Sequence, residues 1–87
     1  MKILKDILYK VAIESVTGST EIAINKIDFD SRKIESDDVF VAIRGSLSDG
    51  HDYIQKAIQL GAIAIICDTL PENTEKGITY IKVKDTN

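Results

Sequence analysis

An unbroken apolar run from Val39 to Ile43 most constrains the fold of this chain. Polar residues bound the run on both sides, and such a run is typical of a strand that is buried on both faces of a sheet. A polar loop over residues 44–50 follows it, and a helical pattern begins directly afterwards. Because ligands of open α/β sheets bind beyond the carboxyl ends of the strands, this loop marks the place where a binding site is expected.

A second apolar run, Ala62 to Cys67, predicts another buried strand after one helix. Three apolar residues at helical spacing lie between the two runs: Ile54, Ala57 and Ile58. We expect Asp52 to cap a helix that begins at Tyr53, with Gln55 completing a capping box. Gly61 suits the left-handed position just after such a helix. The order strand, helix, strand predicts a βαβ unit with parallel strands.

Weaker patterns flank this unit. An amphipathic face predicts a short helix over residues 2–10, and the apolar alternation changes phase near Asn25 and Lys26, which predicts a bend there. A last strand is expected over residues 78–83. Together these elements predict one α/β domain over residues 1–87, with a small, mostly parallel sheet and flanking helices.

The charge pattern argues against several classes of protein. The formal net charge is -3 and the sequence has no basic cluster, which argues against binding to a nucleic-acid backbone. No apolar segment is long enough to cross a bilayer, and the start of the chain is unlike a signal peptide. We therefore expect a cytoplasmic protein with no membrane partner. The single cysteine, Cys67, lies in an apolar run and is expected to be a buried, unreactive thiol.

Motifs for catalysis are absent from the sequence. It contains neither a G-x-x-x-x-G-K-[ST] phosphate loop, nor a G-x-G-x-x-G fingerprint, nor a nucleophile elbow. We therefore predict no catalytic residue, no metal site and no cofactor held by this chain. His51 is the only histidine, and we favour a hydrogen bond that holds the loop, because zinc sites need more ligands of this kind. A hard-metal site among the aspartates is the alternative.

Three motifs follow one another in the middle of the chain: D-S-R at residues 30–32, V-F-V-A-I-R-G at residues 39–45 and D-G-H-D-Y-I at residues 49–54. In this order and spacing they resemble the amino-terminal domain of the Mur ligases. The resemblance implies that residues 1–87 form a substrate-binding domain of that fold. It also implies that the central ATP-binding domain and the carboxyl-terminal domain of the same enzyme are missing here, and the polar end of the chain fits a linker to them.

The resemblance implies a binding site for the UDP group of a UDP-N-acetylmuramoyl-peptide. Carried over by position, the site residues are Phe29, Ser31, Ser46, Leu47 and Ser48. Serine hydroxyls donate hydrogen bonds to uracil or phosphate oxygens, and the ring of Phe29 offers the uracil an apolar face.

Purely structural interpretations of the same segments stay open. Asp30 can cap the backbone of a turn, and Arg32 can pair with Asp30 or Asp38 instead of reaching a phosphate. Residues 46–48 can form a strand-to-helix loop without a ligand.

The resemblance also implies the reaction of the whole enzyme, which uses ATP and Mg²⁺ to form an amide bond in peptidoglycan precursor synthesis. This chain alone is expected to be inactive. The motifs are closest to the family member that adds a diamino acid, lysine or diaminopimelate, to the dipeptide substrate. The member that acts on the tripeptide is the alternative. Two further alternatives are a free-standing nucleotide-binding or interaction module and a metal-dependent hydrolase.

Overall fold

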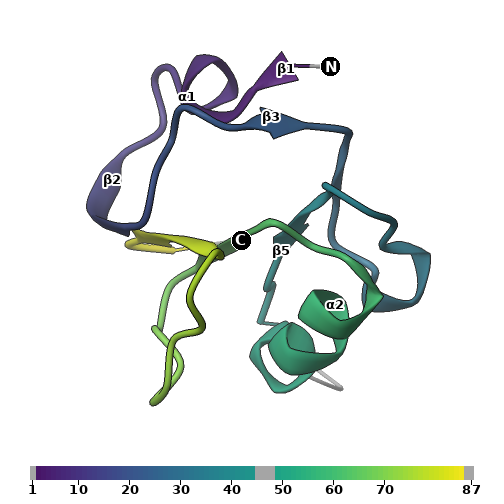
Figure 1. Ribbon diagram of the computed structural model, residues 1–87. Helices are drawn as coiled ribbons and strands as arrows, with labels where there is room; N and C mark the ends of the chain where they lie inside the picture. Colours follow the sequence, from purple (N-terminus) through teal and green to yellow (C-terminus); the bar gives the residue numbers. More distant parts are fainter. Residues whose placement is uncertain (1, 45–48, 86–87) are drawn as a thin grey trace.

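The computed structural model describes residues 2–44 and 49–85 and is built around a five-stranded sheet (Figure 1). Its strands are β2 (Ile13–Thr17), β4 (Ile27–Asp28), β5 (Val39–Val41), β6 (Ala64–Cys67) and β7 (Thr79–Val83). They lie in the order β2-β7-β6-β5-β4, and neighbouring strands are parallel except β2 with β7. The mostly parallel sheet expected from the sequence is confirmed.

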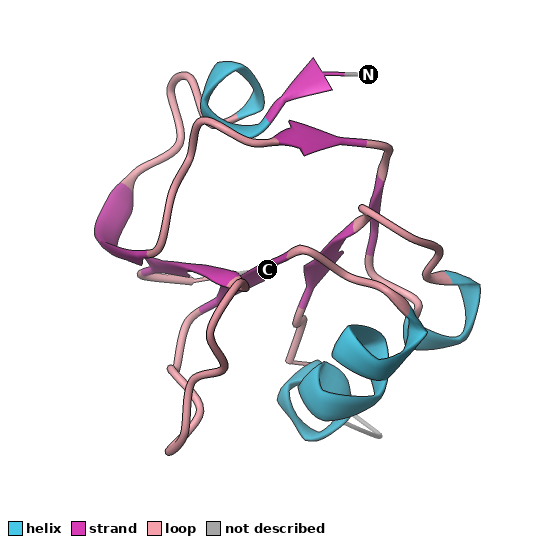
Figure 2. Cartoon of the chain, viewed as in Figure 1, coloured by secondary structure: helices cyan, strands magenta, loops and turns pink. Residues whose placement is uncertain are grey.

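A second, smaller layer is formed by the start of the chain. There β1 (Lys2–Ile3) pairs antiparallel with β3 (Ala23–Ile24), and α1 (Leu4–Ile7) follows β1 directly. The remaining helices are α2 (Ile54–Leu60) and the 3-10 helices η1 (Ser31–Lys33) and η2 (Gly50–Tyr53). Figure 2 shows α1 and α2 on opposite sides of the larger sheet. Within the described ranges, no helix is both long and apolar enough to span a membrane.

The predicted βαβ unit is confirmed, because β5 and β6 are parallel neighbours joined through α2. Gly61 has a φ of +118°, as expected for the left-handed residue after the helix. The predicted start of the helix is wrong. Asp49 caps the preceding turn η2 by accepting from the His51 N–H at 2.9 Å, and α2 begins after Tyr53 with no side-chain cap. Asp52 therefore lies inside η2 and makes no capping box.

The predicted helix over residues 2–10 is mostly wrong. The backbone N–H groups of Leu4 and Lys5 donate to the carbonyl oxygens of Ile22 and Thr20, both at 2.8 Å, so the helix start is tied to the segment before β3. The helix is only four residues long. Lys10 has a φ of +71°, which ends the helical turns. The predicted bend near residues 25–26 is confirmed, because β3 and β4 lie in different sheets.

The core lies on both faces of the larger sheet, because successive residues of each strand point to opposite sides. One cluster packs beneath α2 and includes Phe40, Ala57, Ile65, Cys67 and Tyr80. The other packs beneath the N-terminal layer and includes Leu4, Ile24, Val39, Ala64 and Ile81. Cys67 is fully buried, and this burial raises the pKa of its thiol to about 11, which fits the unreactive thiol expected from the sequence.

Candidate functional site

A hollow of about 540 Å³ opens at the carboxyl ends of β4 and β5. Residues 29–32, which follow β4, contribute Phe29, Asp30, Ser31 and Arg32 to its lining. The strand β5 and the two residues after it contribute Phe40 and Ile43, and the segment from η2 into α2 contributes Gly50, Tyr53 and Lys56. The hollow thus lies at the edge of the sheet where ligands of parallel α/β folds bind. Its volume is within the range of pockets that hold small organic ligands, about 300–1,000 Å³.

Two of the predicted site residues, Phe29 and Ser31, both line this hollow. Phe29 is unusual for a large apolar residue in being 70% exposed, so its ring is available to a ligand. Ser31 is buried at the first position of η1. The other predicted residues, Ser46, Leu47 and Ser48, lie outside the described residues.

The turn that presents Ser31 is held by its acidic neighbour. Asp30 caps η1 by accepting from the Arg32 N–H at 3.0 Å, and its carboxylate also pairs with the Arg32 guanidinium at 3.0 Å. These hydrogen bonds from Arg32 lower the pKa of Asp30 to about 2. The salt bridge of Arg32 with Asp30 is confirmed, whereas Asp38 binds Lys26 instead.

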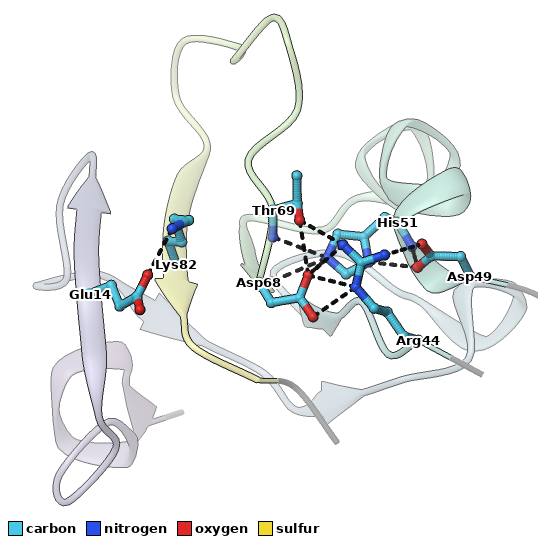
Figure 3. Close-up of polar contacts among 7 residues, drawn as sticks. All are labelled: Glu14, Arg44, Asp49, His51, Asp68, Thr69 and Lys82. Carbon is cyan, nitrogen blue, oxygen red and sulfur yellow. Dashed lines mark hydrogen bonds and ion pairs between the residues drawn. The ribbon is translucent and has the colours of Figure 1, made fainter. Parts of the chain in front are cut away.

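Five polar side chains, the loop-end cluster, fix the two ends of the loop that follows β5 (Figure 3). They are Arg44, Asp49, His51, Asp68 and Thr69. Arg44 pairs with Asp49 at 3.1 Å and with Asp68, at the end of β6, at 2.9 Å. Hydrogen bonds from the Arg44 guanidinium lower the pKa of Asp68. The cluster therefore joins the start and end of the loop to the neighbouring strand.

His51 has the structural role expected from the sequence. Its side chain is 11% exposed, and its Nδ1 lies 2.7 Å from the Asp49 carboxylate. Its Nε2 accepts from the backbone N–H of Asp68 at 3.2 Å. Hydrogen bonds from the His51 backbone and ring lower the pKa of Asp49. Both ring nitrogens are thus occupied by the protein itself.

The described residues do not fit ATP with a metal ion. Gly45 and Gly50 have the spacing of phosphate-loop glycines, but His51 stands where the lysine belongs, with the carboxylates of Asp49 and Asp68 beside it. Arg44 is already paired with both carboxylates, so the described residues of this cluster offer no free cation to a triphosphate. In the part of the chain that the structure describes, no group of three or more His, Cys, Asp or Glu side chains is placed to hold a metal ion.

The lining residues that come from η2 and α2 were not predicted from the sequence. Tyr53 and Lys56 are three residues apart and so lie on the same side of the helix. Tyr53 belongs to the D-G-H-D-Y-I motif, which was the sequence signal for this side of the hollow. Gly50 was also missed. A Cβ there would lie 2.6 Å from the backbone nitrogen of Ile43, so only glycine fits at this wall of the hollow.

Comparison with known proteins gives a family model and curated relatives that agree with one another. A profile described as Mur ligase family, catalytic domain, matches residues 23–87. The UDP-N-acetylmuramoyl-L-alanyl-D-glutamate--2,6-diaminopimelate ligase of Cytophaga hutchinsonii is 46% identical over 84 residues, which is 95% of this chain and 17% of that protein. The ligase of the same name from Clostridioides difficile is 45% identical over 83 residues, again 95% of this chain and 17% of that protein.

Solved structures give the same fold. The MurF ligase from Thermotoga maritima in complex with ADP has a TM-score of 0.62 and 32% identity, covering 71% of this chain and 14% of its own. MurF from Acinetobacter baumannii has a TM-score of 0.64 and 30% identity, covering 72% of this chain and 13% of its own. The chain spans 17% of the length of the curated relatives described above.

Proposed function

Because the chain belongs to the Mur ligase family, we propose that it is the amino-terminal, substrate-binding domain of a MurE-type ligase. In this proposal the hollow anchors the UDP group of UDP-N-acetylmuramoyl-L-alanyl-D-glutamate. The observation that carries it is that Phe29 and Ser31, both expected at a UDP site, line one hollow at the carboxyl edge of the sheet. The relatives named as diaminopimelate ligases are 46% and 45% identical over 95% of this chain, which favours the MurE type.

The chemistry of the lining suits a nucleotide. The exposed ring of Phe29 offers an apolar surface to a flat base, and burial of that ring by the base removes apolar area from water. The hydroxyl of Ser31 can donate to, or accept from, a polar group on the edge of the base. In this proposal neither Phe29 nor Ser31 takes part in the reaction, so the hollow serves only to bind one end of the substrate.

Holding a distant, non-reacting group contributes to catalysis by positioning. Binding energy gained at the UDP end offsets the entropy cost of orienting the reacting carboxylate at the other end. We propose that the parent enzyme joins the glutamate of the dipeptide substrate to 2,6-diaminopimelate, with cleavage of ATP in the presence of Mg²⁺. A central and a carboxyl-terminal domain would carry that chemistry, in the cytoplasm, as a step of peptidoglycan precursor synthesis, and this chain alone would be inactive.

The alternative within the family is a MurF-type ligase, because the two solved structures described above are MurF enzymes. Their identity to this chain, 32% and 30%, is lower than that of the diaminopimelate ligases, and they cover less of it. The whole enzyme separates the two. A MurE-type enzyme consumes the dipeptide substrate with diaminopimelate, and a MurF-type enzyme consumes the tripeptide substrate with D-alanyl-D-alanine.

A UDP titration of the ¹⁵N-labelled chain, followed by amide NMR, tests the proposed function. We expect shifts concentrated at residues 29–32 and 50–56, and little change at β2, which lies at the opposite edge of the sheet. Ser31→Ala should weaken binding by about 3- to 10-fold, the loss of one hydrogen bond. Shifts centred on β2 and β7, or the absence of shifts at millimolar UDP, would contradict the proposal.

A further inference from the structure

Two cationic side chains line the hollow, and only one of them is balanced by a carboxylate. Arg32 is held by Asp30 through Nε–Oδ1 and Nη2–Oδ2 contacts of 3.1 and 3.0 Å. Asp30 lines the same hollow, so this pair adds no net charge to it. Within the described residues, the exposed ammonium group of Lys56 forms no ion pair and no side-chain hydrogen bond with the protein. Lys56 therefore supplies the unbalanced positive charge of the hollow.

The packing of α2 sets the position of Lys56. Ile54 and Ala57 are buried against the core beneath the helix. Tyr53 and Lys56 each directly precede one of these residues and both line the hollow. The helix is thus fixed by its apolar face, and the lysine is carried to the rim of the hollow without a partner of its own.

We propose that Lys56 binds the phosphate groups of the nucleotide and gives the hollow its preference for a nucleoside diphosphate over a nucleoside. This inference rests on the proposed function, because it assigns a residue to the same hollow. A lysine ammonium recognises phosphate as a point charge with three donors. Phe29 stands on the segment after β4, while Lys56 stands on α2. The nucleotide therefore lies across the hollow, with its base toward Phe29 and its phosphates toward α2.

The expected effect follows from the charge of the ligand. Lys56→Gln should lower the affinity for UDP by about 5- to 10-fold, which corresponds to one hydrogen bond to a charged group at an exposed position. The loss should be smaller for UMP, which carries less charge, and absent for uridine. Lys56→Arg keeps the charge and should retain most of the affinity. The difference between UDP and uridine should also shrink as the salt concentration rises.

The matched control is Lys76→Gln. Lys76 is exposed in the turn before β7 and does not line the hollow, so this variant makes the same change in net charge elsewhere. Affinities of the four chains for uridine, UMP and UDP are measured by amide NMR titration, and the amide spectra show directly that each variant is folded. We expect the Lys76 variant to match the unchanged chain with all three ligands.

The outcomes separate this inference from the proposed function. If the unchanged chain binds UDP in the hollow and Lys56→Gln binds it equally well, the inference is overturned while the proposed function stands. An equal loss for UDP and uridine would also overturn it, because that result indicates a general effect on the hollow. If the unchanged chain binds no UDP, the proposed function fails and this inference fails with it.

Discussion

At the scale of single residues, the most constrained polar group is the buried carboxylate of Asp38. It accepts hydrogen bonds from the Asn25 side chain at 2.9 Å and the Glu35 N–H at 2.7 Å, and it pairs with Lys26. Burial opposes its ionisation, but these three contacts outweigh burial and hold the pKa of Asp38 below its usual value. The contacts join the turn before β5 to the bend at residues 25–26. No sequence pattern marked Asp38, which was named only as an alternative partner of Arg32.

Replacement of Asp38 by alanine should destabilise the chain by about 3 kcal/mol, because the Glu35 N–H and the Asn25 amide lose their acceptor and Lys26 loses its buried partner. Urea denaturation followed by circular dichroism measures this change. Glu35→Ala is the control, since Glu35 lies 3.8 Å from the same lysine but is exposed. We expect it to change stability by less than about 0.5 kcal/mol. Equal effects of the two substitutions would contradict a special role of the buried carboxylate.

At the scale of elements, the sequence predicted the helices and strands whose apolar pattern results from burial. It missed those that are held in place by contacts with distant segments. The strands β5 and β6 are unbroken apolar runs because both faces of the sheet are covered. The strand β2 is exposed along its whole length and is held by its pairing with β7, so its sequence shows no burial pattern. Of the site, the segment after β4 was predictable from its motif. On the other side, Tyr53 belongs to the D-G-H-D-Y-I motif, whereas Lys56 was not predictable, because an exposed residue carries no periodic signal.

Gly61 ends α2 and allows its close approach to the turn before β5. A Cβ at this position would lie 2.8 Å from the Cα of Ser36, and the φ of +118° is itself unfavourable for other residues. Gly77 is a matched control, with a φ of +83° but no atom within 4 Å of its Cβ position. We expect Gly77→Ala to cost about 1 kcal/mol and Gly61→Ala about 3 kcal/mol in unfolding free energy. A Gly77 variant as unstable as the Gly61 variant would show that the contact with Ser36 is not decisive.

At the scale of the whole molecule, the two covered faces of the sheet leave its carboxyl edge as the place where polar groups collect. The Asp30–Arg32 pair and the loop-end cluster both lie at this edge, next to the hollow. The Asp30–Arg32 pair is local to η1, whereas the loop-end cluster joins Arg44, after β5, to Asp49 and to Asp68, after β6. The electrostatics of the edge therefore couple the stability of the chain to the pH more strongly than its modest net charge of -3 indicates.

Acid should destabilise the chain over the range in which these carboxylates take up protons. The pKa of Asp30 is lowered to about 2, and the pKa values of Asp38, Asp49 and Asp68 are also lowered. In the unfolded chain an aspartate has a pKa of about 3.9, so the unfolded state binds protons first as the pH falls. The stabilisation is therefore fully present above about pH 5 and is lost progressively as the pH falls toward 2.

Urea midpoints measured at pH 7, 5, 4, 3 and 2 check this dependence, in high salt so that repulsion among the cationic side chains is screened. We expect the midpoint to change little from pH 7 to 5 and to fall steeply below pH 4. Asp68→Asn should flatten the acid limb, because it removes one of the carboxylates that the fold keeps ionised. Glu72→Gln, which removes the same charge from an exposed side chain, should leave the shape of the curve unchanged. A midpoint that stays level down to pH 2 would show that the ion pairs at the carboxyl edge do not stabilise the fold.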